Sequence, residues 1–596
     1  MSSVPERSEI DDEYKWDLES IYANDEDWEA AYEETEERIE ELASYEGEAT
    51  RDGETLLELF ECYESVMRAV QQIAAYARMR RDEDTRDQEY QAMTTRAQSL
   101  GAEASSAASF LEPELQALDR EEIDELIEST DGLEEYGHYV DDVMRMKPHT
   151  RSAEIEGLLA DLSEVTGSPG EIYNILTNAD VEFPTVEDPG GEAVEISLAN
   201  FTKLQKRPNR AFRREVYEQF YDEWAEIRNT VATAYRKSVT ADVKLARARN
   251  YDTAREAAMH GPNVPTDVYD TLLETVDDNL DKLHRHTELK REALGVDELR
   301  MWDLYMPMTE TESPDVPYDE AREHVVEAVG ALGDDYQSRV DEGLDSRWVD
   351  VYENRGKQSG AYSGGTYDTQ PFILMNYQDD VASMYTLAHE LGHSLHSQYT
   401  SEHQPYVYSD YEIFTAEVAS TVNEALLTEH LLETVDDPTF RRHVLNEYLE
   451  RFRSTLYRQT MFAEFEHRAH EIVEEGGALT PDQLDELYRD LKERFYEPAA
   501  FDDRIDREWM RIPHFYRAYY VYQYSTGISA AVALANEILA DGGDAADRYL
   551  EFLQRGSREY PLELLEDAGV DMRSSAPIES ALSTYDDRLD EMAELL

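Results

Sequence analysis

The sequence has a single cysteine, Cys62, among its 596 residues. A lone cysteine excludes intrachain disulfides and thiolate metal sites, so any bound metal must be held by histidines and carboxylates. Long apolar runs are also missing: no stretch approaches about 18 consecutive apolar residues, and we expect no transmembrane helix. The first residues, Met1 to Lys15, are acidic and carry no apolar run. We therefore expect no signal peptide and a cytoplasmic location.

Basic side chains are few. Asp and Glu number 133 against 55 Lys and Arg, of which only 10 are Lys, and the net charge is −78. Such a surface repels nucleic acid and anionic membranes, so neither is an expected partner. An acidic, lysine-poor surface is typical of halophiles that accumulate salt, because molar salt shortens the Debye length to about 3 Å and screens the self-repulsion. We expect partial unfolding in dilute buffer; an affinity for basic peptides is the alternative explanation of the charge.

Helical periodicity dominates the sequence, and the hydrophobic content of 41% indicates a globular protein. The predicted helical stretches are Trp16 to Leu42, Leu56 to Ala77, Tyr90 to Leu111, Pro113 to Glu135, Arg210 to Arg249, Thr266 to Leu294 and, with breaks, Val381 to the C-terminus. Two regions favour strands instead: Val181 to Leu198, with a hairpin signal at Asp188-Pro189-Gly190-Gly191, and Gly360 to Tyr377. The predicted fold class is therefore mainly α, with a small β-sheet beside the motif that follows.

The pattern H-E-x-x-H occurs at His389-Glu390-Leu391-Gly392-His393, within a predicted helix. Two histidines four residues apart project from one face of a helix, which suits a single zinc ion. Glu390 lies beside His389 and can reach a water in an open fourth ligand position. Asp379 or Asp380 is the expected cap of this helix. The alternative interpretation is a pair of histidines that are only packed or solvated on the helix face.

A catalytic zinc site needs a third protein ligand. A second helix, predicted over Tyr411 to Val435, carries Glu417 and Glu424 seven residues apart on one side. Carboxylates that face inward are costly to bury unless they are paired or bound to metal, so either glutamate is a candidate ligand. A solvated acidic face is the alternative. His396 falls near the line of His389 along its helix, and we expect it to pack or to orient a ligand rather than to be one.

A histidine and five tyrosines lie between His514 and Tyr524, directly after Pro513. Hydrolysis of an amide produces an oxyanion that needs hydrogen-bond donors, and histidine and tyrosine can both supply them. Aromatic packing at a helix start would explain the same residues without catalysis.

These motifs resemble the oligoendopeptidase F branch of the thimet oligopeptidase-like zinc peptidases, over nearly the whole chain. The similar segments are H-E-L-G-H, A-E-V-A-S-T-V-N-E around Glu417, W-D-L-x-x-I-Y at Trp16, F-P-T-V at Phe183, G-A-Y-S at Gly360 and Y-V-Y-Q-Y-S-T-G at Tyr520. The resemblance implies that Glu417 is the third zinc ligand and that Glu424 orients a ligand histidine.

The resemblance also implies an architecture of two mainly helical halves that enclose a deep substrate channel. Within it, residues 1–112 form an N-terminal helical region, residues 113–200 a helical region that ends in a hairpin, and residues 201–596 the zinc peptidase region.

The same resemblance gives roles to the tyrosine-rich segment. Matching the Y-Y-x-Y pattern implies that Tyr519 and Tyr522 line the substrate cleft, and that Tyr522 and His514 stabilise the oxyanion. The match departs at two places. His514 lies closer to the tyrosines than in the thimet-type branch, and Phe515 stands where an ungapped match expects a tyrosine, so Phe515 receives no role.

The predicted activity is zinc-dependent hydrolysis of internal bonds in short peptides, with one zinc ion per chain and Glu390 as general base. We expect the strand region Gly360 to Tyr377 to lend its edge to an extended substrate. The oligomeric state is left open between monomer and dimer. Two alternatives remain: a related helical zinc carboxypeptidase, which would remove single C-terminal residues, and a non-enzymatic acidic protein that binds peptides.

Overall fold

The computed structural model describes residues 4–309 and 313–596. The chain forms two compact units, each assembled from three separate stretches of sequence. The first unit comprises Met1–Pro148, Pro314–Thr434 and Leu534–Gly569, and the second comprises His149–Ser313, Val435–Ala533 and Val570–Leu596. The three sequence regions expected above are continuous segments of chain, and that division stays a prediction.

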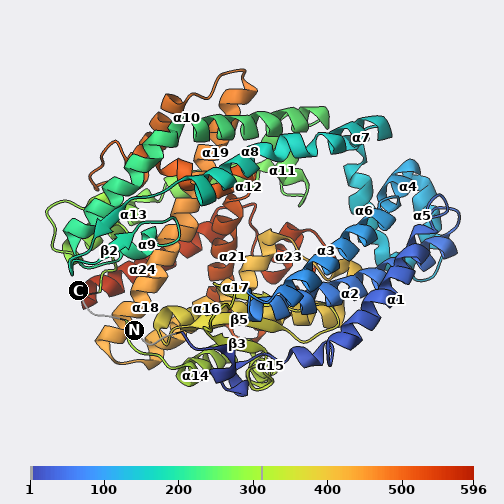
Figure 1. Cartoon of the computed structure of the whole chain (residues 1–596), viewed down its shortest axis with the longest axis horizontal. Helices are drawn as coiled ribbons and strands as arrows, with labels where there is room; N and C mark the ends of the chain where they lie inside the picture. The colour runs from blue at the N-terminus through green and yellow to red at the C-terminus, as the bar shows by residue number, and fades with distance from the viewer. Residues whose placement is uncertain (1–3, 310–312) are drawn as a thin grey trace. The chain divides into compact units, whose positions relative to one another are not determined.

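The first unit is mainly helical, as predicted. Its helices are α1 (Asp25–Ala43), α2 (Gly53–Glu83), α3 (Gln88–Ala108), α4 (Leu111–Ala117), α5 (Arg120–Ser129), α6 (Gly137–Met146), α14 (Tyr318–Ala328), α15 (Asp334–Asp345), α16 (Val381–His403), α17 (Ile413–Thr434), α22 (Gly543–Leu553) and α23 (Pro561–Ala568). Helices α1, α2 and α3 lie side by side at the blue end of the chain (Figure 1). The core between them continues to Phe372 and Leu374 of the sheet described next.

A three-stranded sheet packs against α16 in this unit. Its strands are β3 (Val349–Tyr352), β4 (Tyr362–Gly364) and β5 (Phe372–Tyr377), in the order β3-β5-β4. β4 and β5 confirm the strand region predicted from Gly360 to Tyr377. β3 was missed because it runs parallel to β5, and no local turn signal announces a parallel partner. β4 pairs only with β5 and is thus an edge strand.

The second unit holds the remaining elements. These are α7 (Ala153–Asp161), α8 (Ser163–Ile175), the strands β1 (Thr185–Glu187) and β2 (Ala193–Glu195), α9 (Phe201–Gln205), α10 (Arg210–Ala248), α11 (Ala254–His260), α12 (Thr266–Asp277), α13 (Leu280–Ala293), α18 (Pro438–Arg451), α19 (Arg458–Glu474), α20 (Pro481–Phe495) and α24 (Ala576–Leu595). Helix α21 (Tyr522–Asp541) begins in the second unit's sequence and ends in that of the first. The antiparallel pair β1–β2 confirms the predicted hairpin.

Three predicted helices differ from the observed ones. The helix predicted from Trp16 begins only at Asp25, because the side chain of Asn24 accepts hydrogen bonds from two N–H groups of the first turn and caps it there. The stretch that begins at Pro113 divides into α4 and α5, with Asp119 in a capping box at the start of α5. The stretch from Thr266 divides into α12 and α13 at Asn279.

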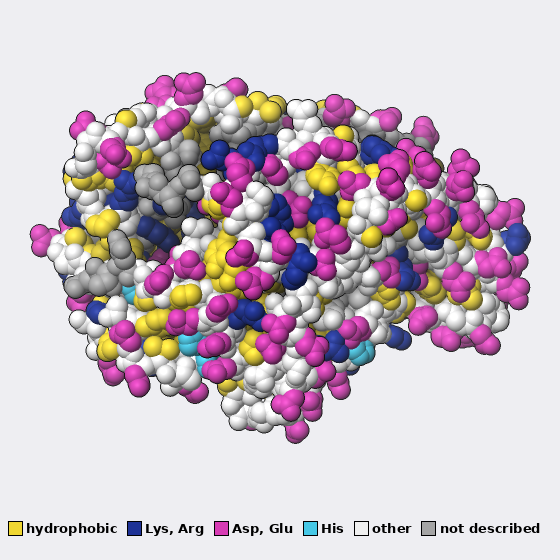
Figure 2. All heavy atoms as spheres, turned by 60° about the horizontal axis from the view of Figure 1, so that its bottom comes forward, with side chains coloured by type: hydrophobic (Ala, Val, Ile, Leu, Met, Phe, Trp, Pro, Cys, Tyr) yellow, Lys and Arg dark blue, Asp and Glu magenta, His cyan; other side chains and the backbone are white. Residues whose placement is uncertain are grey.

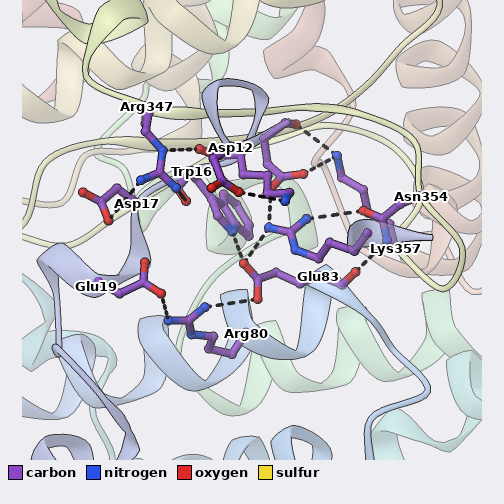
Figure 3. A network of polar contacts seen from close by, with 12 residues as sticks. Asp12, Trp16, Asp17, Glu19, Arg80, Glu83, Arg347, Asn354 and Lys357 are labelled. Atoms are coloured by element: carbon purple, nitrogen blue, oxygen red, sulfur yellow. Dashed lines mark hydrogen bonds and ion pairs between the residues drawn. The ribbon is translucent and has the colours of Figure 1, made fainter. Parts of the chain in front are cut away.

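The segment before α1 is attached to the sheet by buried charges (Figure 3). Arg7 Nη2 lies 2.6 Å from both a carboxylate oxygen of Glu83 and one of Asp350, and Lys357 Nζ lies 2.6 Å from the other Asp350 oxygen. The indole N–H of Trp16 donates to Glu83 at 2.9 Å. Burial alone would raise the pKa of Asp350, but the charges of Lys357 and Arg7 hold it below its usual value. Asp350 on β3 is thus a charged anchor for the N-terminal segment.

The surface is dominated by acid. Figure 2 shows Asp and Glu side chains spread over the whole visible face, with Lys and Arg fewer between them. This distribution agrees with 133 acidic residues against 55 basic ones. Within the described ranges, none of the helices combines the length and the apolarity that a membrane span requires.

Candidate functional site

Helix α16 carries the H-E-x-x-H motif in the first unit. Asp380 rather than Asp379 caps it, since its side chain accepts the Ser383 N–H at 2.8 Å. The backbone of Asp379 is instead left-handed, with φ of 52°. Most of the buried residues of α16 are apolar, and this burial fixes the rotation of the helix, so that His389 and His393 face away from its apolar core.

Helix α17 packs closely along α16. The contact is possible because residue 392 is glycine: a Cβ there would lie 2.6 Å from the carbonyl oxygen of Ala419 and 2.6 Å from Cα of Ser420. Carbon atoms in ordinary contact are about 3.5–4.0 Å apart, so any larger residue would push the two helices apart. Asn423 of α17 also donates to the carbonyl oxygen of Ala388, at 3.2 Å.

This close approach brings three potential metal ligands together. His389 Nε2 lies 3.2 Å from His393 Nε2 and 3.7 Å from Glu417 Oε2. Among the described residues these three form the one group of histidine, cysteine or carboxylate side chains whose ligand atoms all lie within 4.8 Å of one another. Two ligands at the usual zinc distances in a tetrahedral arrangement are roughly 3.4 Å apart. The donor set and its spacing therefore fit one metal ion of this size.

Burial prepares His393 as a neutral ligand, and a carboxylate orients His389. Burial lowers the pKa of His393 to about 3, with His389 adding to the fall and a hydrogen bond to the backbone of Ala416 opposing it. On His389, Nδ1 lies 2.6 Å from Oε1 of the buried Glu424. A carboxylate at Nδ1 fixes the tautomer in which Nε2 offers a lone pair to a metal. Of the two glutamates that the sequence left as alternatives, Glu417 lies at the Nε2 side and Glu424 at the Nδ1 side.

Glu390 lies on α16 between the two histidines and is only 7% exposed. Burial raises the pKa of Glu390 to about 7; the Ser363 N–H, which donates to its carboxylate, opposes the rise, and the charge of Glu417 adds to it. The Ser363 hydroxyl also contacts that of Ser394, at 2.8 Å. Strand β4 thus holds the Glu390 carboxylate through a backbone donor.

A cavity of about 850 Å³ in the first unit opens onto these groups. Glu390, His393 and Glu417 line one part of it, and β4 with the following loop to Pro371 lines another. Because β4 is an edge strand, its side that does not pair with β5 can accept the backbone of an added strand. The cavity therefore combines ligand atoms, a carboxylate and an unpaired strand edge.

His396 belongs to the packing around the site. Its ring stacks on Tyr411 with 3.8 Å between centroids and lies 5.4 Å from the ring of Phe552. Burial lowers its pKa to about 3, so the imidazole is neutral. This placement corresponds to the packing interpretation of His396.

The other predicted site residues belong to the second unit. His514 is half-buried in a 3-10 helix, Pro513–Tyr516, and its ring centroid lies 6.0 Å from those of Tyr520 and Tyr524. Tyr524 donates to the Tyr520 hydroxyl at 3.3 Å. We call His514, Tyr520 and Tyr524 the aromatic cluster.

Tyr519 and Tyr522 lie outside this cluster. Both are buried, at 2% and 1% exposure, and both pack on Tyr269, with centroids 5.6 and 5.2 Å from its ring. Tyr519 has a left-handed backbone, with φ of 53°, and its N–H donates to Glu466 at 2.8 Å. The second unit therefore brings together His514 with Tyr520 and Tyr524, and Tyr519 with Tyr522.

Sequence reasoning missed two residues of the site, Gly392 and Ser363. Gly392 was visible only as the variable fourth letter of the motif, although a glycine inside a strong helical pattern is itself a signal of close backbone approach. Ser363 acts through its backbone N–H, which no side-chain pattern can reveal.

The comparison with protein families identifies two matches along the chain. A model described as "Peptidase family M3" matches residues 203–584, and one described as "Oligopeptidase F" matches residues 114–183. The first alone covers more than half of the chain, including the three potential metal ligands and the tyrosine-rich segment.

Similar proteins cover the same length. The chain is 42% identical to oligopeptidase PepF of Bacillus subtilis over 596 residues, all of this chain and 89% of that protein. It is 40% identical to group B oligopeptidase PepB of Streptococcus agalactiae, over 99% of this chain and 98% of that one. A crystal structure of oligoendopeptidase-F from Enterococcus faecium superposes with a TM-score of 0.74 at 36% identity, covering 96% of this chain and 99% of that one.

Proposed function

The chain belongs to the oligoendopeptidase F branch of peptidase family M3 and is a metalloendopeptidase, and from this premise we propose that it is a zinc enzyme that cuts internal bonds of short peptides. The observation that carries the proposal is the convergence of His389, His393 and Glu417 at one cavity wall, with the carboxylate of Glu390 beside them. Short peptides are proposed as substrates because the similar proteins are named as oligopeptidases.

In this proposal His389, His393 and Glu417 hold one zinc ion per chain. When bound, zinc supplies Lewis acidity toward the scissile carbonyl and the attacking water. The half-buried His393 contributes a neutral nitrogen donor, and Glu424 keeps His389 in the required tautomer and orientation.

Glu390 is the proposed general base. Its carboxylate accepts a proton from the water that attacks the scissile carbonyl, and then donates that proton to the nitrogen of the leaving amine. The Ser363 N–H holds this carboxylate at the cavity wall, and the low exposure of Glu390 keeps bulk water from competing for the proton.

The edge of β4 is the proposed track for the substrate backbone. Gly364 pairs with Phe372 of β5, so replacing it with proline distorts β4, and we expect a higher KM with zinc content unchanged. If KM in Gly364→Pro equals that of the unmodified enzyme, the substrate does not bind to this strand.

His514, Tyr519 and Tyr522 are the proposed oxyanion and substrate groups. A lost oxyanion donor lowers kcat by about 10²–10³, so Tyr522→Phe should do so while Tyr524→Phe should not. The reverse result would assign the donor to the aromatic cluster, in which His514 lies next to Tyr520 and Tyr524.

The decisive experiment uses the zinc-loaded enzyme and an internally quenched peptide blocked at both ends. We expect Glu390→Gln to lose a factor of about 10²–10⁴ in kcat while it keeps one zinc per chain. Glu433→Gln, a change of an exposed glutamate on α17, is the matched control.

Three outcomes would contradict the proposal. Unchanged activity in Glu390→Gln would contradict the role of Glu390 as general base. Activity in protein that contains no zinc would contradict the role of the metal. Cleavage that requires a free C-terminus and releases single residues would instead indicate the carboxypeptidase alternative.

A further inference from the structure

Exposed large apolar side chains are concentrated on α7 and α8. Of the eight such residues within the described ranges, five lie on these helices or the residue between them and are 41% to 65% exposed. They are Leu158, Leu162, Val165, Ile172 and Ile175. A protein with this much surface charge gains nothing in solubility from such a cluster, and contiguous exposed apolar surface commonly marks a binding site.

Three of these residues line a groove of about 920 Å³ between α8 and α10, helices that lie side by side in the second unit (Figure 1). Leu162, Val165 and Ile172 form part of one wall, and α10 forms the other. The groove is within the size range of pockets for small ligands and peptides, which are mostly apolar with a few polar groups.

The charges of the groove are opposite to those of the protein as a whole. Among the described residues that line it, Lys237 and Lys244 of α10 are the only charged ones. Both are exposed, and none of the ion pairs between described residues involves either of them. In a chain with 133 carboxylates and 10 lysines, a groove with two such lysines and no carboxylate favours an occupant with apolar side chains and a negative charge.

The dimensions of the groove suit a short peptide. Its residues on α10 run from Asn229 to Ala248, which spans roughly 28 Å of helix at 1.5 Å per residue. An extended peptide of about eight residues has the same length at about 3.3 Å per residue. Lys237 and Lys244 are roughly 10 Å apart along the helix axis, so carboxylates at different positions of a peptide can meet one or the other.

Helix α8, which forms one wall of the groove, also packs on a segment that carries predicted site residues. Tyr173 of α8 stacks on Tyr516, with 4.5 Å between ring centroids. A Cβ at Gly170 of α8 would lie 3.8 Å from Cβ of Tyr516. Tyr516 belongs to the same 3-10 helix as His514, so the wall of the groove packs directly on the segment that carries the aromatic cluster.

We propose that the groove between α8 and α10 binds oligopeptide substrates, with apolar side chains against Leu162, Val165 and Ile172 and the C-terminal carboxylate at Lys237 or Lys244. This inference rests on the proposed oligopeptidase function and adds to it a substrate class: peptides with apolar residues and a free C-terminus. An amidated or fully polar peptide of the same length binds less tightly.

The test measures binding to the zinc-loaded, full-length Glu390→Gln variant by fluorescence anisotropy. The probes are an N-terminally labelled leucine-containing octapeptide acid, its amide, and the acid with serine in place of leucine. Salt is kept at the lowest concentration at which the protein remains folded, because high salt screens an exposed lysine–carboxylate contact. The same substitutions are then made in the active enzyme to measure KM and kcat separately.

We expect Leu162→Gln with Val165→Gln to weaken binding of the leucine peptide by about tenfold or more, a normal cost of lost apolar contacts. KM should rise and kcat should be unchanged, because the lost contacts stabilise the ground state and the transition state equally. The matched control is Leu158→Gln with Ile175→Gln, two exposed residues on the same helices that do not line the groove.

The lysines are tested in the same way. Lys237→Gln with Lys244→Gln should abolish the preference for the acid over the amide, whereas the exposed Lys203→Gln should preserve it.

Equal affinity of all groove variants and wild type for all three probes overturns the proposal. If the groove variants change the mass measured by light scattering without changing peptide affinity, the occupant is a second copy of the chain. Residual hydrolysis by Glu390→Gln would contradict the proposed function but not the groove.

Discussion

Replacing Gly392 with alanine places one methyl group between α16 and α17, the two helices that carry the proposed metal ligands. The new Cβ would lie 2.6 Å from Cα of Ser420 and 2.8 Å from its backbone nitrogen. Both neighbours are backbone atoms, so no side chain can rotate to make room. Restoring an ordinary contact requires a separation of α16 and α17 by about 1 Å.

That displacement can be compared with what a metal site tolerates. Glu417 is attached to α17 one turn before Ser420, and its Oε2 lies 3.7 Å from His389 Nε2. Ligand distances in metal sites vary by only about 0.2 Å, so a shift of ~1 Å takes Glu417 out of reach of a metal held by the two histidines. We expect zinc affinity to fall by at least about 100-fold. This is more than the usual loss of affinity when a residue that hydrogen-bonds a metal ligand is removed. The overpacking itself should cost about 1–3 kcal/mol of stability.

The assay is a zinc titration against a chromophoric chelator, with thermal unfolding measured with and without zinc. The variant should lose most of the zinc-dependent rise in the unfolding midpoint, while its metal-free midpoint falls only modestly. Gly101→Ala on α3 is the matched control, since its Cβ would meet only Val70 Cγ1, at 3.7 Å. This control variant should be more stable than the wild type by up to about 1 kcal/mol and should bind zinc with unchanged affinity. Wild-type zinc affinity in Gly392→Ala would refute the role of the close helix approach.

Three further predictions concern the metal site, the buried charges and the surface. Glu424→Gln should reduce zinc affinity by about 10–100-fold by weakening the hydrogen bond to His389, whereas Glu433→Gln should not; equal effects in a chelator titration would contradict this. Asp350→Asn should destabilise the protein by about 3–5 kcal/mol in denaturant unfolding, because Lys357 is fully buried and would lose its carboxylate. The control, Asp345→Asn, removes an exposed ion pair with Arg322 and should cost less than about 1 kcal/mol. The thermal midpoint should be higher in about 3 M KCl than in about 0.1 M KCl, and equal midpoints would show that self-repulsion of the acidic surface is unimportant.

Helices with strong periodicity could be predicted closely from the sequence. The stretch predicted from Arg210 to Arg249 is α10, Arg210–Ala248, and the motif helix begins at Val381 as expected. The errors occur where a side chain or a distant partner overrides periodicity. Asn24 caps α1 eight residues after the apolar pattern starts, and before it only the apolar Trp16, Leu18 and Ile21 are buried, by packing outside an α-helix. Strand β3 exists only because β5 pairs with it.

The placement of the two histidines could be predicted from the sequence because helix geometry is local. His389 and His393 are four positions apart, which places both on one helix face in any protein, and a single cysteine leaves only histidines and carboxylates as ligands. The choice between Glu417 and Glu424 is different in kind. It depends on how α17 is rotated against α16. The spacing of residues along α17 does not show which of the two glutamates faces the histidines of α16.

The sequence by itself thus determined the types of residue available for the site, the helical class of the fold and the excess of negative charge. The tertiary structure decided which atoms meet: Nε2 of His389 near Glu417 and Nδ1 against Glu424, Glu390 beside a backbone donor of β4, and His396 stacked in the packing. It also separated the buried Tyr522 from the half-buried aromatic cluster of His514. The physical reason is that periodicity follows from bonds within a few residues, whereas contact between distant segments follows from how closely two surfaces can pack. At Gly392 that limit is set by the absence of a single methyl group.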